Sequence, residues 1–127
     1  PLAKKILVAE DNMDVLVIIQ TALRDAGYDV ITAVGGEEAI EQTKQHEFDL
    51  ILTDLAMPKV SGVDVISALK NAPGTWRIPI VAVTAHWTDQ ISVSASAAGC
   101  DGFIAKPFSK EELLYEVEKH LSLGKRG

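Results

Sequence analysis

The chain has 127 residues, of which 47% are hydrophobic and 24% are charged, as expected for one globular domain with its own core. Its formal net charge of -6 argues against direct binding to nucleic acid, because such binding needs a basic face. The apolar runs are too short to insert into a membrane, and the single cysteine, Cys100, excludes an intrachain disulfide and favours a cytoplasmic location.

The first part of the chain alternates between strand and helix patterns. Residues 5–9 are an apolar run of strand length, and residues 28–34 form a second such run. Between them, Asn12 is suited to cap a helix and Gly27 to follow its end. Apolar residues recur at helical spacing in this first helix: Val15, Ile18, Ile19, Ala22, Leu23 and Ala26. A second helix is predicted over residues 37–45.

A short buried strand is predicted in the middle of the chain. Residues 50–53 (Leu-Ile-Leu-Thr) run directly into Asp54, and Pro58 then stops regular structure. A short apolar run before such a breaker is typical of a strand buried in a parallel sheet. Asp54 then lies at the carboxyl end of this strand, where open α/β sheets place their ligand sites.

The second half of the chain continues the alternation. Ser61 with Asp64, and Ser109 with Glu112, have the spacing of capping boxes, which open helices. The predicted elements are a helix over residues 61–71, a strand over 80–83, a strand over 103–105 and a helix over 109–121.

Residues 91–97 carry conflicting patterns. Their order, Ile-Ser-Val-Ser-Ala-Ser-Ala, alternates with a period of two and taken alone predicts a strand. Thr88 and Asp89 instead indicate a helix start, and Gly99 indicates a stop. Parallel strands also require a crossover, so we predict a helix of low intrinsic stability.

Five successive strand-helix units predict the α/β fold class. Right-handed crossovers favour a single doubly wound, five-stranded parallel sheet with helices on both faces. We expect residues 1–127 to form one domain, with a core over about residues 4–121 and a short tail over residues 122–127.

Polar residues follow four of the five predicted strands: Glu10 and Asp11 the first, Asp54 the third, Thr84 the fourth and Lys106 the fifth. Parallel strands end at one edge of a sheet, so these side chains can converge there. Three carboxylates repel one another unless a cation lies among them, and hard oxygen ligands suit Mg²⁺. Lys106 and the Thr84 hydroxyl supply the charge and the donor that a phosphoryl group needs, and an aspartate can attack phosphorus.

The motifs at these strand ends carry a resemblance to a known family. They are Glu10-Asp11, Asp54 with Met57-Pro58 and Gly62, Thr84-Ala85, and Lys106-Pro107-Phe108. In this order and spacing, the chain resembles the receiver domain of two-component response regulators of the chemotaxis-regulator type. The resemblance implies a flavodoxin-like (βα)5 fold with strand order 2-1-3-4-5 and a cis bond before Pro107.

The resemblance also implies roles for the site residues. Asp54 would accept a phosphoryl group from a phosphohistidine on a sensor histidine kinase or phosphotransfer protein. Asp11, the Asp54 carboxylate and the backbone carbonyl of Ala56 would hold Mg²⁺, with Mn²⁺ as an alternative ion. Glu10 would act through a metal-bound water, and Lys106 would pair with phosphoryl oxygens.

The implied output is a change of surface. Thr84 would move toward the phosphoryl group and Phe103 would turn inward, which remodels the face of the fourth helix, fifth strand and fifth helix. The partner is then a downstream protein, a fused output domain or a second copy in a phosphorylation-dependent homodimer. Such a domain is no enzyme beyond catalysing its own phosphorylation and dephosphorylation.

Two other functions compete with this interpretation. A phosphatase of the haloacid-dehalogenase type needs a second acid two residues after its nucleophile, where this chain has Ala56, so we reject it. A receiver that is not phosphorylated and serves for docking or dimerisation stays open as the alternative. The lifetime of an aspartyl phosphate also stays open, because Ala56 offers no side-chain group to position a water whereas His86 does.

A few aromatic residues have no assigned role. His86 and His120 are expected at the surface. Trp76 and Trp87 lie in predicted loops, where they serve either packing or partner contacts.

Overall fold

The computed structural model describes residues 3–124 and contains the predicted alternation of strands and helices. The elements are β1 (Lys5–Ala9), α1 (Met13–Asp25), β2 (Asp29–Ala33), α2 (Gly36–Gln45), β3 (Leu50–Asp54), α3 (Gly62–Lys70), β4 (Ile80–Thr84), α4 (Asp89–Ala98), β5 (Gly102–Ala105) and α5 (Lys110–Gly124). The tail expected over residues 122–127 is wrong in part, because α5 continues to Gly124. The rest of that tail, and residues 1 and 2, lie outside the described residues. No helix in the described part of the chain is long and apolar enough to cross a bilayer.

The strands form one parallel sheet in the order β2-β1-β3-β4-β5, which confirms the predicted order. The register pairs Ala9 with Thr53, and Thr84 with Ala105. The carboxyl ends of β1, β3, β4 and β5 therefore lie along one edge of the sheet, and the residues that follow them can meet.

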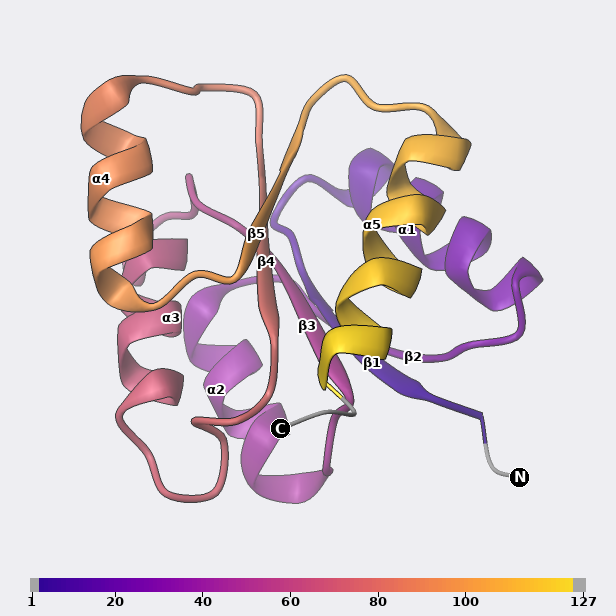
Figure 1. Ribbon diagram of the computed structural model, residues 1–127, viewed down its shortest axis with the longest axis horizontal. Helices are drawn as coiled ribbons and strands as arrows, with labels where there is room; N and C mark the ends of the chain where they lie inside the picture. The colour runs from indigo at the N-terminus through magenta and orange to yellow at the C-terminus, as the bar shows by residue number, and fades with distance from the viewer. Residues whose placement is uncertain (1–2, 125–127) are drawn as a thin grey trace.

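Two hydrophobic layers cover the two faces of the sheet. Alternate residues of a strand point to opposite faces, so Ile6 and Val8 join one layer, whereas Leu7 and Ala9 join the other. Helices α1 and α5 cover the first face, and α2, α3 and α4 cover the second (Figure 1). The sheet is therefore buried on both sides.

The buried stripe of α1 differs from the predicted one. Ile18 is 59% exposed and Ala26 is also exposed, whereas Leu16, which lies outside the predicted stripe, is only 3% exposed. The first half of this helix is apolar nearly all round, so its sequence alone does not select the face that meets the sheet. Asn12 caps the helix as predicted, accepting hydrogen bonds from the backbone N–H groups of Asp14 and Val15.

The segment with conflicting patterns is helical, as predicted. The Thr88 hydroxyl accepts a hydrogen bond from the backbone N–H of Ile91 at 3.1 Å, which caps α4. Gly99 ends the helix with a φ of 108°, in the left-handed region that favours glycine. Ala95 is its one fully buried residue among those described, so α4 is held by few core contacts.

His120 is buried, with 5% of its surface exposed, so its predicted surface position is wrong. It follows Leu113 and Val117 on the buried side of α5, and its ring packs under Gly102, where a Cβ atom would overlap it. Its Nε2 lies 3.6 Å from Glu116 Oε1. Residue type suggested the surface, but helical spacing placed it on the stripe that faces β5.

Candidate functional site

Three carboxylates meet at the edge of the sheet where the strands end. Carboxylate oxygens of Glu10, Asp11 and Asp54 all lie within 4.8 Å of one another. Because β1 and β3 are neighbours in the sheet, the residues at their ends are brought together without any long loop. Glu10 and Asp54 are 1% and 6% exposed, whereas Asp11 is open to solvent.

Lys106 joins this cluster from the end of β5. Its Nζ lies 2.6 Å from Glu10 Oε1 and 3.0 Å from Asp54 Oδ2. The bond between Lys106 and Pro107 is cis, in agreement with the resemblance. The predicted convergence of Glu10, Asp11, Asp54 and Lys106 on one edge is therefore found.

The ionisation of this cluster follows from its burial and contacts. Burial raises the pKa of Glu10, and hydrogen bonds from Lys106 and from the backbone of Asn12 only partly oppose this. Burial lowers the pKa of Lys106, but its hydrogen bonds to Glu10 and Asp54 outweigh burial and leave that pKa raised. Lys106 thus stays a cation at neutral pH between two carboxylates.

The loop after β3 fixes the orientation of Asp54. Its Oδ1 accepts a hydrogen bond from the backbone N–H of Ala56 at 3.0 Å, while Oδ2 faces Lys106. The loop then folds back over the strand end, where the N–H of Gly62 donates to the carbonyl of Leu55 at 3.1 Å. A Cβ on Gly62 would overlap the Asp54 carbonyl, so the tight return needs glycine.

Sequence reasoning missed a positioning contact in this site. The backbone N–H of Asn12 donates to Glu10 Oε2 at 3.1 Å, so the residue that caps α1 also orients the buried acid. The pattern that could have shown it is the cap itself, two residues after Glu10.

Thr84 and Phe103 make their contacts with residues outside the carboxylate cluster. Thr84 is 1% exposed, and its hydroxyl accepts a hydrogen bond from the backbone N–H of His86 at 3.2 Å. Phe103, on β5, is 36% exposed and makes an edge-on contact with Trp87, with 4.7 Å between ring centroids. Trp87 is half-buried and packs on the core, whereas Trp76 is exposed.

The donor set of the cluster fits a hard divalent cation. Its three carboxylates offer oxygen ligands, and Lys106 balances only one of their charges. Mg²⁺ is bound in proteins through one or two carboxylates and keeps several waters, which an exposed residue such as Asp11 permits.

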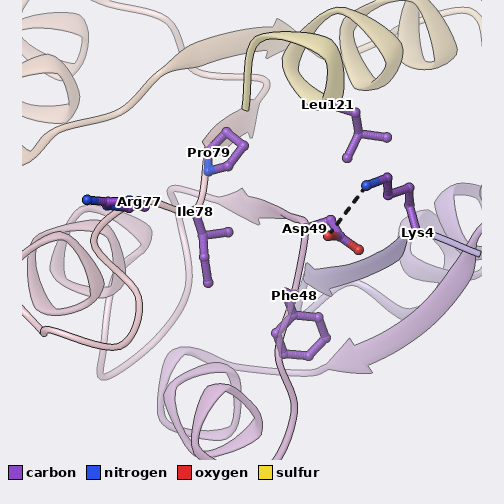
Figure 2. Close-up of a pocket in the computed structure, with 7 residues that line it drawn as sticks. All are labelled: Lys4, Phe48, Asp49, Arg77, Ile78, Pro79 and Leu121. Carbon is purple, nitrogen blue, oxygen red and sulfur yellow. Dashed lines mark ion pairs between the residues drawn. The ribbon is translucent and has the colours of Figure 1, made fainter. Parts of the chain in front are cut away.

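A cavity of about 300 Å³ lies elsewhere, beside the amino ends of the strands. Figure 2 shows Lys4 and Asp49 facing each other across it, with 3.9 Å between Nζ and Oδ1, while Arg77 points outward. Phe48 and Leu121 supply apolar walls. The cavity holds one partly exposed ion pair. It lies at the amino ends of the strands, whereas Asp54 lies at a carboxyl end, so it forms no part of the site.

Comparison with known proteins decides the family. A family model described as the response regulator receiver domain matches residues 6–118. The chain belongs to this family. The receiver domain is 30% identical over 120 residues to the polar-differentiation response regulator DivK of Brucella ovis, covering 94% of this chain and 98% of DivK.

Other relatives are longer than this receiver domain. It is 34% identical over 121 residues to the phosphate regulon transcriptional regulatory protein PhoB of Rhizobium meliloti, covering 95% of this chain and 53% of PhoB. The chain spans about half the length of this and other curated relatives.

A solved structure shows the likeness of the fold. The receiver domain of sensor histidine kinase PA1611 from Pseudomonas aeruginosa matches with a TM-score of 0.88 and 28% identity, covering 94% of this chain and 98% of that one. That protein has a magnesium ion coordinated in its active-site cleft. The fold described here is therefore shared with a receiver domain that holds a magnesium ion.

Proposed function

We propose that this receiver domain accepts a phosphoryl group on Asp54 and thereby switches a protein-binding surface. The observation that carries the proposal is the buried Asp54 carboxylate, held between the Lys106 ammonium at 3.0 Å and two further acids. A carboxylate so placed is a nucleophile beside a fixed cation, which is the arrangement that phosphoryl transfer requires.

The proposed donor is a phosphohistidine on a sensor histidine kinase or a phosphotransfer protein. An Asp54 carboxylate oxygen forms a bond to phosphorus, the bond between phosphorus and the imidazole nitrogen breaks, and that nitrogen keeps the electron pair. The product is an aspartyl phosphate. Lys106 then pairs with phosphoryl oxygens in place of the Asp54 oxygen that it contacts now.

Asp11, Asp54 and the backbone carbonyl of Ala56 are the proposed Mg²⁺ ligands, with Glu10 acting through a bound water. When bound, Mg²⁺ neutralises charge on the transferring phosphoryl oxygens. The chain's own groups do the rest: Asn12 and Lys106 orient Glu10, and the Ala56 N–H orients Asp54. Mn²⁺ offers a similar preference for oxygen ligands and is the proposed substitute.

The proposed switch runs from Thr84 to Phe103. Thr84 exchanges its contact with the His86 backbone for a phosphoryl oxygen, and the loop to α4 moves with it. Trp87, three residues after Thr84, touches the ring of Phe103, so movement of the loop is passed to β5. The face of α4, β5 and α5 changes as a result, and a downstream protein, an output domain or a second copy responds to it. We also propose that the protein is cytoplasmic, in keeping with its single unpaired cysteine.

The proposal is tested by intact mass after incubation with acetyl phosphate and Mg²⁺. We expect a gain of about 80 Da on the wild type that EDTA prevents. Asp54→Asn should show no gain, whereas Asp64→Asn, an exposed acid outside the cluster, should behave as wild type. An equal gain in Asp54→Asn would show that another group is modified and would contradict the proposal.

A further inference from the structure

A groove of about 450 Å³ lies between β5 and α5. Within residues 3–124, β5 pairs only with β4, so its other side is a lateral edge of the sheet, beside α5 (Figure 1). Phe103 lines the groove from β5, and Tyr115 lines it from α5. None of the lining residues belongs to the carboxylate cluster around Asp54.

The aromatic side chains of this groove are unusually open. Tyr115 is 66% exposed and Phe103 is 36% exposed. Exposed aromatic side chains offer a large contact area at little entropic cost, and aromatic residues dominate the binding energy of protein interfaces. The groove therefore has the apolar part of a docking surface.

The charged side chains that line the groove have one sign. Glu111, Glu112 and Glu116 line it, and the two lysines of α5, Lys110 and Lys119, do not. An anionic rim around an apolar floor attracts cations and repels anions.

We infer that this groove binds a protein segment in which Lys or Arg side chains flank apolar ones. Nucleic acids and acidic membranes are anionic, so the glutamate rim repels them. A second copy docked groove to groove would set three glutamates against three glutamates, which disfavours an isologous dimer at this surface. The inference deepens the proposed function and rests on it in one respect: Phe103 is both a groove residue and the proposed switch.

The test measures binding of two designed peptides by fluorescence anisotropy. One has a Leu face flanked by Lys, and the other has Glu in place of every Lys. We expect the Lys peptide to bind more tightly, and its affinity to fall as salt is raised. Tyr115→Ala should weaken its binding by about 10-fold, and Glu111→Gln by about 2- to 5-fold. Both residues are exposed, so neither change removes a core contact.

The matched control is Glu37→Gln on α2, an exposed glutamate on a different face of the domain. It makes the same change of net charge and should leave the affinity unchanged. Equal binding of the two peptides, or equal loss in Glu37→Gln and Glu111→Gln, would overturn the inference. Self-association seen by analytical ultracentrifugation and abolished by Tyr115→Ala would also overturn it, in favour of a second copy.

Failure of this inference is distinguishable from failure of the proposed function. The peptide preference is measured first on the unmodified domain, and the mass gain on Asp54 is measured separately. A mass gain without a preference for the Lys peptide leaves the function and removes the inference. A preference that is present and changes in affinity when Asp54 is phosphorylated supports both.

Discussion

Lys106 joins two buried carboxylates that come from distant parts of the chain. Glu10 precedes it by 96 residues and Asp54 by 52. Removing charges from water is costly, so such a buried cluster is a weak source of net stability. It is nevertheless expensive to break, because Glu10 and Asp54 would be left facing each other without a cation. Lys106 therefore sets the geometry of the site more than it stabilises the fold.

We predict that Lys106→Met lowers the free energy of unfolding by about 1–3 kcal/mol, because two buried carboxylates lose a charged hydrogen-bond donor. Urea unfolding measures this. Burial already raises the pKa of Glu10 above its ordinary value of 4.5, and the substitution removes the lysine hydrogen bond that opposes burial. Folding then disfavours the ionised Glu10 more strongly. The loss of stability relative to wild type should therefore be small at acid pH and grow as pH rises through the raised pKa of Glu10 in the folded protein.

The control for this substitution is Lys44→Met. Lys44 pairs with Glu41 at 3.9 Å, but both side chains are more than half exposed. Its removal should change the free energy of unfolding by no more than about 0.5 kcal/mol. Equal losses for the two lysines would show that the buried position of Lys106 does not matter.

Cys100 offers a prediction about pH. Burial raises the pKa of its thiol above the ordinary value of 9.0, and the thiol donates a hydrogen bond to the Gly102 carbonyl at 3.0 Å. Below pH 9.0 the thiol is neutral in both the folded and the unfolded protein, so it leaves the free energy of unfolding unaffected there. Stability is lost as pH rises through the raised pKa that the thiol has in the folded protein. We expect the rate at which iodoacetamide alkylates Cys100 to rise with pH, with a midpoint above pH 9.0 in the native protein. In the urea-unfolded protein the midpoint should be that of a free thiol. A native midpoint at or below that of the unfolded chain would contradict the burial argument.

At the scale of elements, α4 differs from α5 in how it is held on the sheet. It buries one residue fully, Ala95. Four of its ten residues are Ser or Asp, which favour caps and turns over helix interiors. By contrast, α5 buries Leu113, Val117 and Leu121 against the sheet. The helix that follows the proposed switch residue Thr84 is thus held in its position by fewer fully buried side chains than α5.

We predict that α4 exchanges its amide hydrogens faster than α5 and gains protection when Asp54 carries a phosphoryl group or beryllofluoride. The reason is that a weakly packed helix opens locally, and a new contact at Thr84 would order the loop that leads into it. Hydrogen exchange read by mass spectrometry on peptides from the two helices measures this. Peptides from α5 are the internal control. Protection of α4 that is the same in both states would remove it from the switch.

The sequence was sufficient for the order of elements and for the edge of the sheet that carries the site. Apolar runs ending at Asp54 and Lys106 gave strand ends, and parallel topology then required convergence. It was insufficient where packing decides among equal choices. Leu16 and Ile18 are both apolar, and only the docking of α1 on the sheet shows which is buried. The pairing of Trp87 with Phe103 likewise depends on how the loop after β4 meets β5 in space.

At the scale of the whole molecule, the apolar core covers both faces of the sheet, and the two acidic clusters lie outside it. Both faces of the sheet are covered by helices, so the core tolerates little change. Two separate places each bring three acids together, the carboxylate cluster at the strand ends and the glutamates of the groove beside β5. The first is suited to a small cation and the second to a cationic protein segment, and β5 lies between them with Lys106 at its end and Phe103 within it.

The carboxylate cluster should also link metal binding to global stability. Acids held close together repel one another in the folded state and separate on unfolding, so a cation that binds only the folded domain stabilises it. We predict that Mg²⁺ at about 100 times its dissociation constant raises the free energy of unfolding by about 2.7 kcal/mol, and that EDTA reverses the gain. Asp11→Asn should reduce the gain because it removes one of the three carboxylates, whereas Asp14→Asn, an exposed acid outside the cluster, should preserve it. Urea unfolding at several Mg²⁺ concentrations measures the effect. A gain of equal size in Asp11→Asn would mean that the ion stabilises the domain from somewhere other than this cluster.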